Sequence, residues 1–258
     1  MEEMKKFPNV FEEKKGRNTF YFIRTNDKKS FFEERVISKK GELFREVDPE
    51  RSKLFASIAK GISQLGIKQD SKVLYLGASH GYTVSFLADV VCDGEIYALD
   101  FAPRVVRDLV FLCEDKKNVA PILDDANHPE NYKEIVPMVD VVFMDIAQRE
   151  QTKIFLKNCD MYLKEGGFGI LALKARSIDV TRNPKDIFRI TRSQLDVVMN
   201  VVDYRELAPF EQDHAVFVCK RKSSEPIDFL NIPSIVVDQK KNFLPRKEFS
   251  KPSFRKRY

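Results

Sequence analysis

The sequence predicts an α/β fold in which a doubly wound, mostly parallel sheet follows a small N-terminal β module. Between residues 72 and 198, short runs that are apolar throughout alternate with stretches of helical periodicity. Strands of this kind are buried on both faces by the helices that connect them, which is typical of a parallel sheet. After residue 200 two apolar runs are separated only by a short loop, so we expect an antiparallel strand pair at one edge.

Residues 1–50 form the predicted β module. Here short aromatic or β-branched runs alternate with polar turns, which indicates a small antiparallel sheet. The expected strands are Thr19–Ile23, Glu34–Ile37 and Glu42–Arg45. From Ser52 the apolar residues take helical spacing, and we expect an amphipathic helix that runs to Leu65 and stops at Gly66.

The main domain is predicted over residues 51–221 as repeated units of a strand followed by a helix. The units are, in order, Lys72–Leu76 with Val84–Val91, Glu95–Leu99 with Val105–Cys113, Val119–Leu123 with Tyr132–Val136, Val139–Met144 with Thr152–Leu163, and Phe168–Leu173 with Ile187–Val198. The final strands are Val201–Glu206 and His214–Lys220. Residues 222–258 contain prolines and dense charge, so we expect a basic and irregular C-terminal tail.

The composition indicates a soluble globular protein. Of the 258 residues, 43% are apolar and 32% are charged, and no apolar run approaches the ~18 residues of a membrane helix. The first ten residues carry charge without a following apolar segment, so no secretory signal is indicated. We therefore expect an intracellular protein without a membrane partner.

The four cysteines, Cys92, Cys113, Cys159 and Cys219, are scattered through apolar surroundings and show no C-x-x-C spacing. Neither a zinc site nor a disulfide framework is indicated, and no metal is expected. Since an unpaired cysteine behaves as a small hydrophobic side chain, we expect all four cysteines in the core.

Most of the positive charge lies near the C-terminus. Residues 240–258 contain eight Lys or Arg and one Glu, a charge of +7, so residues 1–239 carry −2 of the total of +5. Sequence-independent affinity for nucleic acid comes from neutralising phosphates, and a nearly neutral body supplies little of it. An RNA substrate would therefore need other molecules to hold it. The tail either contacts RNA non-specifically or is simply solvated.

A candidate cofactor loop follows the first predicted strand of the main domain. In open α/β sheets, ligands bind beyond the carboxyl ends of the strands, and the segment Gly77–Thr83 (GASHGYT) lies at such an end. Its glycines have GxxxG spacing, which disfavours a nicotinamide dehydrogenase with GxGxxG and is more typical of a loop that holds S-adenosylmethionine. A plain strand-to-helix turn explains the glycines equally well. The loop residues expected to contact the cofactor are Gly77, Ala78, Tyr82 and Thr83.

Polar residues follow the next three strands as well. Asp100 lies 23 residues after Gly77, close to the ~20-residue offset of a ribose-binding carboxylate, and Phe101 offers a flat face for adenine. The alternative for Asp100 is a cap on the helix that begins near Pro103. The further candidates are Asp125 and Ala126 after the third strand, where an Asx turn is the alternative, and Asp145 and Gln148 after the fourth strand.

Several segments together carry a family resemblance. They are Glu34–Val36, Arg51–Leu54, Leu74–Ala78, Phe101–Arg104, Asp125–Asn127, Asp145–Gln148, Leu173–Asp179, Pro209–Glu211 and Asp213–His214. Over about residues 30–220 they resemble, in the same order, segments of fibrillarin, the RNA 2′-O-methyltransferase of C/D-box guide ribonucleoproteins. The most specific of them is Leu173–Asp179, which reads LKARSID.

The resemblance implies a guide-RNA-dependent enzyme that transfers the methyl group of S-adenosyl-L-methionine to ribose 2′-hydroxyls in rRNA or tRNA. It also implies three partners besides the substrate, namely a Nop-domain scaffold protein, a kink-turn-binding ribosomal-type protein and a C/D-box guide RNA. The compartment would be the cytoplasm in an archaeon and the nucleolus in a eukaryote.

The resemblance further implies that Lys53, Asp145, Lys174 and His214 correspond to the catalytic constellation of the family. A ribose hydroxyl is a poor nucleophile, so we expect Lys174 to accept its proton, with its pKa lowered by Lys53 and the sulfonium. Asp145 would orient Lys174, while His214 and Lys53 would position the hydroxyl and its phosphate. Without the resemblance, Lys53 reads as a solvated surface lysine and His214 as a surface histidine with satisfied hydrogen bonds, while Lys174 reads equally well as a surface residue or a site residue.

The sequence departs from the family pattern near the predicted cofactor loop. Tyr82 and Thr83 stand where the family has two small hydroxyl residues, His80 replaces a small residue, and Asp100 replaces a glutamate. A second hypothesis follows, in which the chain is a structural subunit of the ribonucleoprotein that lost efficient cofactor binding through Tyr82 and His80. Affinity for the cofactor separates the two hypotheses.

Overall fold

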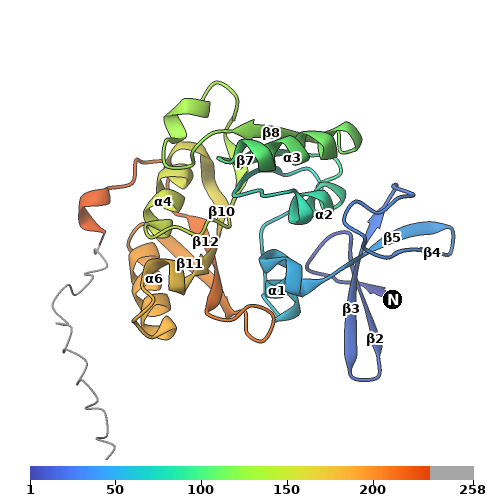
Figure 1. The fold of residues 1–258 in the computed structure, drawn as a ribbon. Helices are drawn as coiled ribbons and strands as arrows, with labels where there is room; N and C mark the ends of the chain where they lie inside the picture. Colours follow the sequence, from blue (N-terminus) through green and yellow to red (C-terminus); the bar gives the residue numbers. More distant parts are fainter. Residues whose placement is uncertain (233–258) are drawn as a thin grey trace, which may run out of the picture.

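Two sheets organise the computed structural model, which describes residues 1–232 (Figure 1). A five-stranded antiparallel sheet is built from the first 47 residues, and a seven-stranded sheet is built from residues 72–221. Of the predicted basic tail, residues 233–258 lie outside the described residues. Its described part contains one 3₁₀ turn, η3 (Phe229–Asn231).

The central sheet has the strand order β11-β12-β10-β9-β6-β7-β8. Its strands are β6 (Lys72–Leu76), β7 (Glu95–Asp100), β8 (Val119–Leu123), β9 (Val139–Met144), β10 (Leu163–Lys174), β11 (Met199–Glu206) and β12 (His214–Arg221). Strands β6 to β10 pair in parallel, whereas β12 is antiparallel to both β10 and β11. The doubly wound, mostly parallel fold and its antiparallel edge are therefore confirmed. The strand order reverses between β6 and β9, where a ligand crevice is expected.

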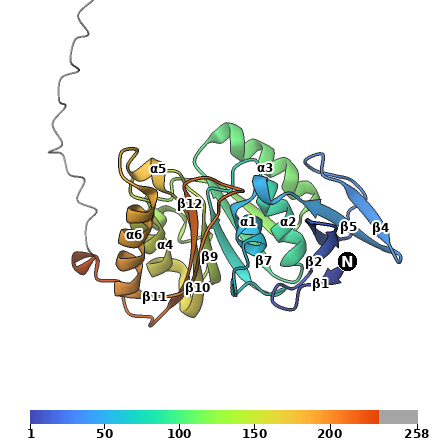
Figure 2. The same cartoon turned by 90° about the horizontal axis from the view of Figure 1, so that it is seen from below.

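Helices cover both faces of the central sheet (Figure 2). One face carries α1 (Lys53–Ala59), α2 (Tyr82–Val90) and α3 (Pro103–Asp115), and the other carries α4 (Gln151–Tyr162) and α6 (Pro184–Val198). A hydrophobic core lies on each face of the sheet. Within β6 the side chains alternate between the two cores, because Val73 and Tyr75 pack on the face of α1, α2 and α3, whereas Leu74 and Leu76 pack on the face of α4 and α6. Burial on both faces explains why the strand is apolar throughout.

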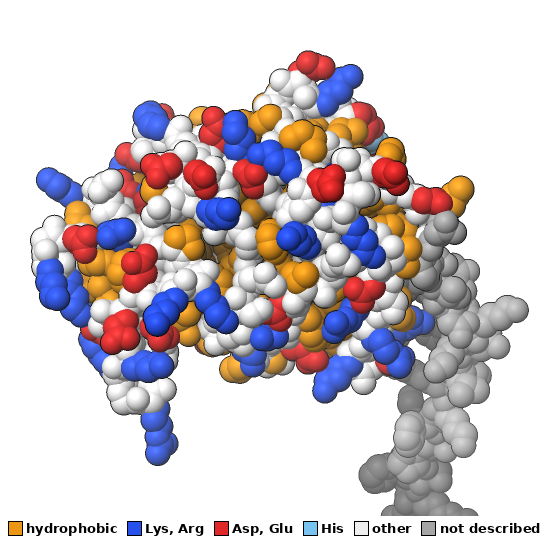
Figure 3. Space-filling view, turned by 180° about the vertical axis from the view of Figure 1, so that it is seen from behind, with side chains coloured by type: hydrophobic (Ala, Val, Ile, Leu, Met, Phe, Trp, Pro, Cys, Tyr) orange, Lys and Arg blue, Asp and Glu red, His pale blue; other side chains and the backbone are white. Residues whose placement is uncertain are grey.

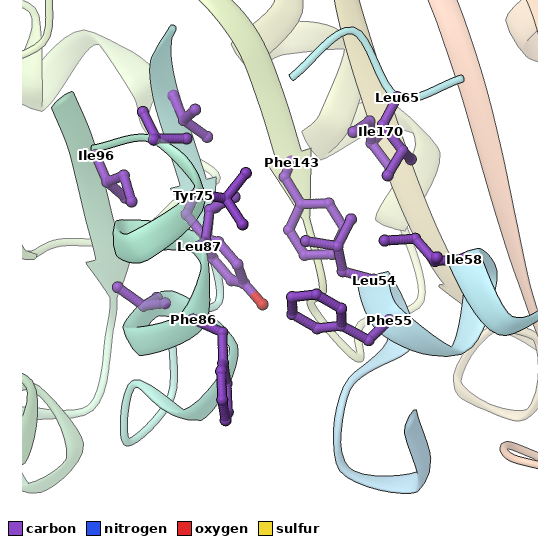
Figure 4. Close-up of a cluster of buried hydrophobic side chains, with 14 of the residues drawn as sticks. Leu54, Phe55, Ile58, Leu65, Tyr75, Phe86, Leu87, Ile96, Phe143 and Ile170 are labelled. Carbon is purple, nitrogen blue, oxygen red and sulfur yellow. The ribbon is translucent and has the colours of Figure 1, made fainter. Parts of the chain in front are cut away.

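Helix α1 packs its apolar face onto the central sheet (Figure 4). Leu54 and Phe55 point toward Tyr75 and Phe143, which come from the neighbouring strands β6 and β9. The helix therefore starts directly over the strand-order switch, and its first residue is held close to the carboxyl ends of these two strands.

Two predicted helices differ from the observed elements. Helix α1 ends at Ala59 instead of Leu65, because Gly61 takes a left-handed φ of +74° that terminates the helix. Tyr132–Val136 is not a helix. Between β8 and β9 the chain forms the 3₁₀ turn η2 (Pro129–Tyr132) and no α-helix. Pro137 follows directly, and the residue before a proline is disfavoured in helical conformation, so the segment has no room for further turns.

The prediction for the cysteines is correct only in part. Cys159 and Cys219 are fully buried, whereas Cys113 is half-buried and Cys92 is exposed. Cys92 lies in the turn after α2, beyond the face that this helix buries. Within residues 1–232, no three His, Cys, Asp or Glu side chains are grouped so that they could hold a metal ion. No helix in this part of the chain is long and apolar enough to span a bilayer.

The N-terminal sheet has the order β1-β2-β3-β5-β4, and all its pairs are antiparallel as predicted. Its strands are β1 (Glu2–Glu3), β2 (Val10–Lys15), β3 (Asn18–Thr25), β4 (Val36–Lys39) and β5 (Glu42–Val47). Strand β2 was not predicted, because its EEKK segment lacks alternating apolar residues. The strand expected from Glu34 begins at Val36, since the Glu34 carboxylate instead accepts the backbone N–H groups of Phe31 and Phe32.

A buried ion network joins the N-terminal sheet to the main domain. The guanidinium of Arg45 on β5 is fully buried and lies 2.6 Å from Glu34 and 2.9 Å from Asp89 on α2. It also donates to the carbonyl and hydroxyl oxygens of Ser85. Lys116, after α3, binds Asp89 as well. Desolvation raises the pKa of Glu34, but Arg45 and backbone N–H groups outweigh it, so the pKa is lowered below its ordinary value.

We expect Arg45→Ala to reduce the free energy of unfolding by about 3–5 kcal/mol, because it leaves the buried Glu34 carboxylate without its cation and Asp89 with Lys116 alone. Urea unfolding at about pH 7 measures this loss. As a control, Arg35→Ala removes a cation that is half exposed and pairs with Glu46, and it should cost no more than about 1 kcal/mol. Equal losses in the two variants would contradict the assigned role of Arg45.

The same variant has a defined pH dependence. Because the pKa of Glu34 is lowered in the folded state, the ion pair stabilises the protein fully above the ordinary pKa of about 4.5. This stability is lost as the pH falls through the lowered pKa and Glu34 gains a proton. The difference between wild type and Arg45→Ala should therefore stay constant from about pH 7 to about pH 4.5 and shrink at lower pH, and a difference that stays constant in acid would exclude the ion pair as its source.

Candidate active site

A pocket opens at the carboxyl ends of β6, β7, β8 and β9, beside the strand-order switch. Most of the predicted cofactor residues line it, namely Gly77, Asp100, Phe101, Asp125, Ala126, Asp145 and Gln148. The remaining lining residues are Ser79, Leu99, Asp124, Ile146 and Ala147. The parallel topology therefore gathers segments from four different strand ends around one cavity.

Gly77 is required by close backbone approach at the floor of this pocket. Its φ is +82°, and a Cβ at this position would lie 2.4 Å from the backbone oxygen of Asp145 and 2.9 Å from the Ile146 side chain. Any side chain would push the end of β6 away from the end of β9. The loop is thus more than a plain strand-to-helix turn, because it closes the pocket against the neighbouring strand.

Asp100 presents a carboxylate that the backbone holds in place. Its two oxygens accept the N–H groups of Ser79 at 3.0 Å and Ala102 at 3.1 Å. Ala102, and not Asp100, is the N-cap of α3, so the alternative role as a helix cap is not observed. Each carboxylate oxygen keeps a further lone pair for a ligand hydroxyl. The adjacent Phe101 is 67% exposed and offers the pocket an uncovered aromatic ring.

Asp125 and Gln148 are linked through Asn127. The Asp125 carboxylate accepts the backbone N–H of Asn127 at 2.9 Å and its side-chain amide at 2.8 Å. The same amide donates to Gln148 at 3.2 Å. The Asx turn considered as an alternative is therefore present, and its carboxylate also lines the pocket. The backbone hydrogen bond from Asn127 holds the pKa of Asp125 below its ordinary value.

Three predicted cofactor residues do not line the pocket. Ala78 is buried, the Thr83 hydroxyl donates to Ser52 at 2.9 Å, and Tyr82 turns toward the N-terminal sheet. The Tyr82 hydroxyl accepts the N–H of Asp48, and its ring lies 4.1 Å from the guanidinium of Arg51. His80, the other bulky residue of the loop, pairs with Asp108 on α3. The side chains of Tyr82 and His80 therefore both lie outside the pocket lining.

Lys53 and Asp145 form an ion pair that connects α1 to the pocket. Ser52 is the N-cap of α1, and Lys53 is its first residue. From there the Lys53 ammonium reaches the Asp145 carboxylate at 3.0 Å. Lys53 is thus not a solvated surface lysine. The expectation that Asp145 orients Lys174 is not met, because no hydrogen bond or ion pair joins these two residues. Desolvation raises the pKa of Asp145, although the Lys53 ammonium opposes this shift.

Lys174 and His214 face each other across the β10–β12 pair. Lys174 is exposed at the end of β10, and its ammonium has no hydrogen bond or ion pair with any other part of residues 1–232. His214 is only 8% exposed, and its Nδ1 lies 2.6 Å from the carbonyl oxygen of Gln212. In the neutral ring Nδ1 must then carry the proton, which leaves Nε2 as an acceptor.

Glu211 was not among the predicted site residues. Its carboxylate lies 3.9 Å from the Lys53 ammonium and 3.6 Å from Nδ1 of His214. It belongs to the loop that joins β11 to β12, so strand-end reasoning on the parallel part of the sheet does not find it. The sequence signal that could have identified Glu211 is its place in Pro209–Glu211, one of the segments that carry the family resemblance.

Comparison with known proteins adds an independent finding. The family model described as Fibrillarin matches residues 1–223. The chain belongs to the fibrillarin family. The Lys53–Asp145 pair and the strand-end pocket thus lie within the part of the chain that carries the family match.

Three relatives of this fibrillarin family member illustrate the match. The fibrillarin-like rRNA/tRNA 2′-O-methyltransferase of Pyrococcus abyssi is 47% identical over 189 residues, which are 73% of this chain and 83% of the relative. The crystal structure of Aeropyrum pernix fibrillarin in complex with natively bound S-adenosyl-L-methionine has 35% identity and a TM-score of 0.77, over 84% of this chain and 96% of that one. The crystal structure of a fibrillarin/Nop5p complex has 35% identity and a TM-score of 0.77, over 83% of this chain and 98% of that one.

The environment of His214 predicts a neutral imidazole at physiological pH. Burial lowers its pKa below the ordinary value of 6.5, and Lys53 adds to this, while the Gln212 carbonyl and Glu211 oppose it. An NMR titration of the histidine ring protons should therefore give a midpoint below 6.5. The signal is assigned by its absence in His214→Gln, and a midpoint above 6.5 would contradict the assigned environment.

Proposed function

We propose that this protein is an S-adenosyl-L-methionine-dependent RNA ribose 2′-O-methyltransferase that works within a C/D-box guide ribonucleoprotein. The observation that carries the proposal is the double role of Asp145. Its carboxylate lines the strand-end pocket and also holds the Lys53 ammonium at 3.0 Å. A cofactor in the pocket would therefore lie directly beside the cluster of cationic and imidazole groups that meets the substrate.

The residues of the pocket fit S-adenosyl-L-methionine. Asp100 keeps acceptor positions for two ribose hydroxyls, and Phe101 supplies an open ring for the adenine. Asp125 is held ionised and near the polar edge expected for the adenine amino group. The Aeropyrum pernix relative, with the same fold, contains this cofactor. Since Tyr82 and His80 lie outside the lining, the structure gives no steric support to the hypothesis of a purely structural subunit.

The proposed chemistry divides three tasks among four residues. When bound, S-adenosyl-L-methionine supplies a methyl group that is electrophilic because it is attached to a sulfonium. Lys174 projects from the end of β10, where its ammonium has no partner among residues 1–232, and accepts the proton of the 2′-hydroxyl as the oxygen attacks in line. His214, opposite Lys174 on β12, positions the ribose with its neutral imidazole. Lys53, fixed by Asp145, places a positive charge where the adjacent phosphate lies.

Target choice is proposed to come from partners. On the face shown in Figure 3, Lys and Arg side chains are interspersed with Asp and Glu side chains, and residues 1–239 carry a charge of −2. Such a body provides little sequence-independent affinity for RNA. The fibrillarin/Nop5p complex supports a Nop-domain scaffold as one partner, and the Pyrococcus abyssi relative supports rRNA or tRNA substrates. The family resemblance adds a kink-turn-binding protein and a guide RNA to the proposed partners. The archaeal relative from Pyrococcus abyssi supports the cytoplasm as the compartment.

Asp100→Ala should weaken binding of S-adenosyl-L-methionine by about 1–3 kcal/mol, or roughly 5- to 150-fold, since it removes charge-assisted hydrogen bonds to the ribose. Isothermal titration of the purified chain measures the effect. Asp108→Ala removes a carboxylate of α3 that pairs with His80 outside the pocket, and it should leave the affinity within about twofold. If both variants bind like wild type, the ribose does not lie at Asp100.

Lys174→Ala should reduce methyl transfer by at least about 100-fold while binding of the cofactor stays within about tenfold, because Lys174 acts on the hydroxyl in the transition state. The measurement is transfer of labelled methyl groups in a complex reconstituted with scaffold, kink-turn-binding protein and guide RNA. Lys164→Ala, at the opposite end of the same strand, serves as the matched control and should keep full activity.

The substrate supplies a second control for this measurement. An RNA with a deoxyribose at the target nucleotide should accept no methyl group, because the reacting hydroxyl is missing. Transfer to the deoxyribose substrate, or unchanged transfer by Lys174→Ala, would count against the proposed reaction.

A further inference from the structure

The end of strand β10 has a free edge where it carries Lys174. Its parallel neighbour β9 stops short, since the last registered pair is Leu171 with Met144. On the other side β12 continues, and Ala175 donates to Asp213 at 3.0 Å. Backbone groups alternate in direction along an antiparallel pair, so the N–H and C=O of Lys174 point away from β12 toward the edge that β9 leaves open.

Gln151 fills this edge. Its side-chain carbonyl accepts the N–H of Lys174 at 3.0 Å, and its amide donates to the C=O of Lys174 at 3.1 Å. Both backbone groups of Lys174 are thus bound by one side chain, which takes the place of a continued β9 strand. Gln151 is fully buried at the start of α4, so its own position is fixed by the core.

The contact between Gln151 and Lys174 uses both hydrogen-bonding groups of one side chain on a single residue. An amide side chain has one acceptor and one donor group at the spacing of a peptide unit, and a buried amide left unbound would cost roughly 1–3 kcal/mol. Here both functions of the amide are directed to a single residue, and that residue carries the group proposed to accept the proton. The Lys174 side chain itself has no partner in residues 1–232, so its reach depends on where its backbone is held.

We propose that Gln151 is a positioning residue for methyl transfer, which fixes the backbone of Lys174 so that its amine reaches the ribose hydroxyl. This inference rests on the proposed function and adds a residue to it. Gln151 is not among the lining residues of the pocket, and its side-chain hydrogen bonds go to Lys174 and not to Lys53 or Asp145, so its effect passes through Lys174. A displacement of about 1 Å at a reacting group lowers rates by up to about 100-fold, which sets the scale of the expected loss.

The test uses Gln151→Met, which keeps the length of the side chain and removes both hydrogen bonds. In the reconstituted complex, kcat per site that binds S-adenosyl-L-methionine should fall by roughly 10- to 100-fold, with KM for the RNA and Kd for the cofactor within about threefold. Counting binding sites by titration removes the effect of misfolded protein. Gln151→Glu, which keeps the acceptor for the Lys174 N–H and loses the donor, provides a second variant with an intermediate loss.

Thr152→Val is the matched control, because Thr152 is the next residue of α4, is also buried and has a hydroxyl without a partner in the described chain. It should keep the wild-type kcat. If kcat per binding site in Gln151→Met equals that of wild type or of Thr152→Val, the proposal is overturned. A loss of thermal stability without a loss of kcat would likewise assign Gln151 a purely structural role.

Hydrogen exchange separates this inference from the proposed function. The Lys174 amide should exchange faster in Gln151→Met than in wild type, while amides of β6 and β7 keep their protection. If wild type transfers no methyl group, the proposed function fails, yet faster exchange still supports the positioning of Lys174 by Gln151. Unchanged exchange at Lys174 overturns the inference whatever the enzyme does.

Discussion

Burial of strands β6 and β9 on both faces is the constraint on which the remaining structure depends. Helices close over both sides of these strands, so every residue from Val73 to Leu76 is buried and neither face of β6 is open to a ligand. Chemistry is thereby confined to the strand ends, where the backbone turns and polar side chains regain solvent. Gly77 marks this boundary, because the two central strands come so close at their ends that no side chain fits between them.

The N-terminal sheet contributes to the site without lining the pocket. Its last strand leads through the turn η1 (Pro49–Arg51) to Ser52, whose side chain caps α1 and receives the Thr83 hydroxyl from the cofactor loop. That cap places Lys53 at the helix start, within reach of Asp145. Tyr82 extends the same connection by packing on Arg51. Of the residues that depart from the family pattern, Tyr82 and Thr83 thus lie at the joint between module and domain.

Sequence reasoning found the central strands and the antiparallel edge, because apolar runs and helical periodicity are local signals. It placed Asp100, Asp125 and Asp145 around one site, because strand ends of a parallel sheet converge whatever the details of packing. The partner of Asp145 was missed, since Lys53 is 92 residues away and its approach depends on how α1 sits on the sheet. Strand β2 and the two hydrogen bonds between Gln151 and the Lys174 backbone were missed for a related reason. Both depend on backbone pairing, which leaves no periodic pattern in the sequence.

The ion network around Arg45 bears on the order in which the chain acquires its structure. A nascent chain leaves the ribosome from its N-terminus, so all five strands of the first sheet emerge before α2. Arg45 and Glu34 are buried only when Ser85 and Asp89 have arrived, and Lys116 completes the network later still. An early sheet would therefore hold charges that lack their full set of partners. The N-terminal sheet therefore reaches its final charge pairing only after α2 and α3 have been synthesised, although its own strands precede both helices.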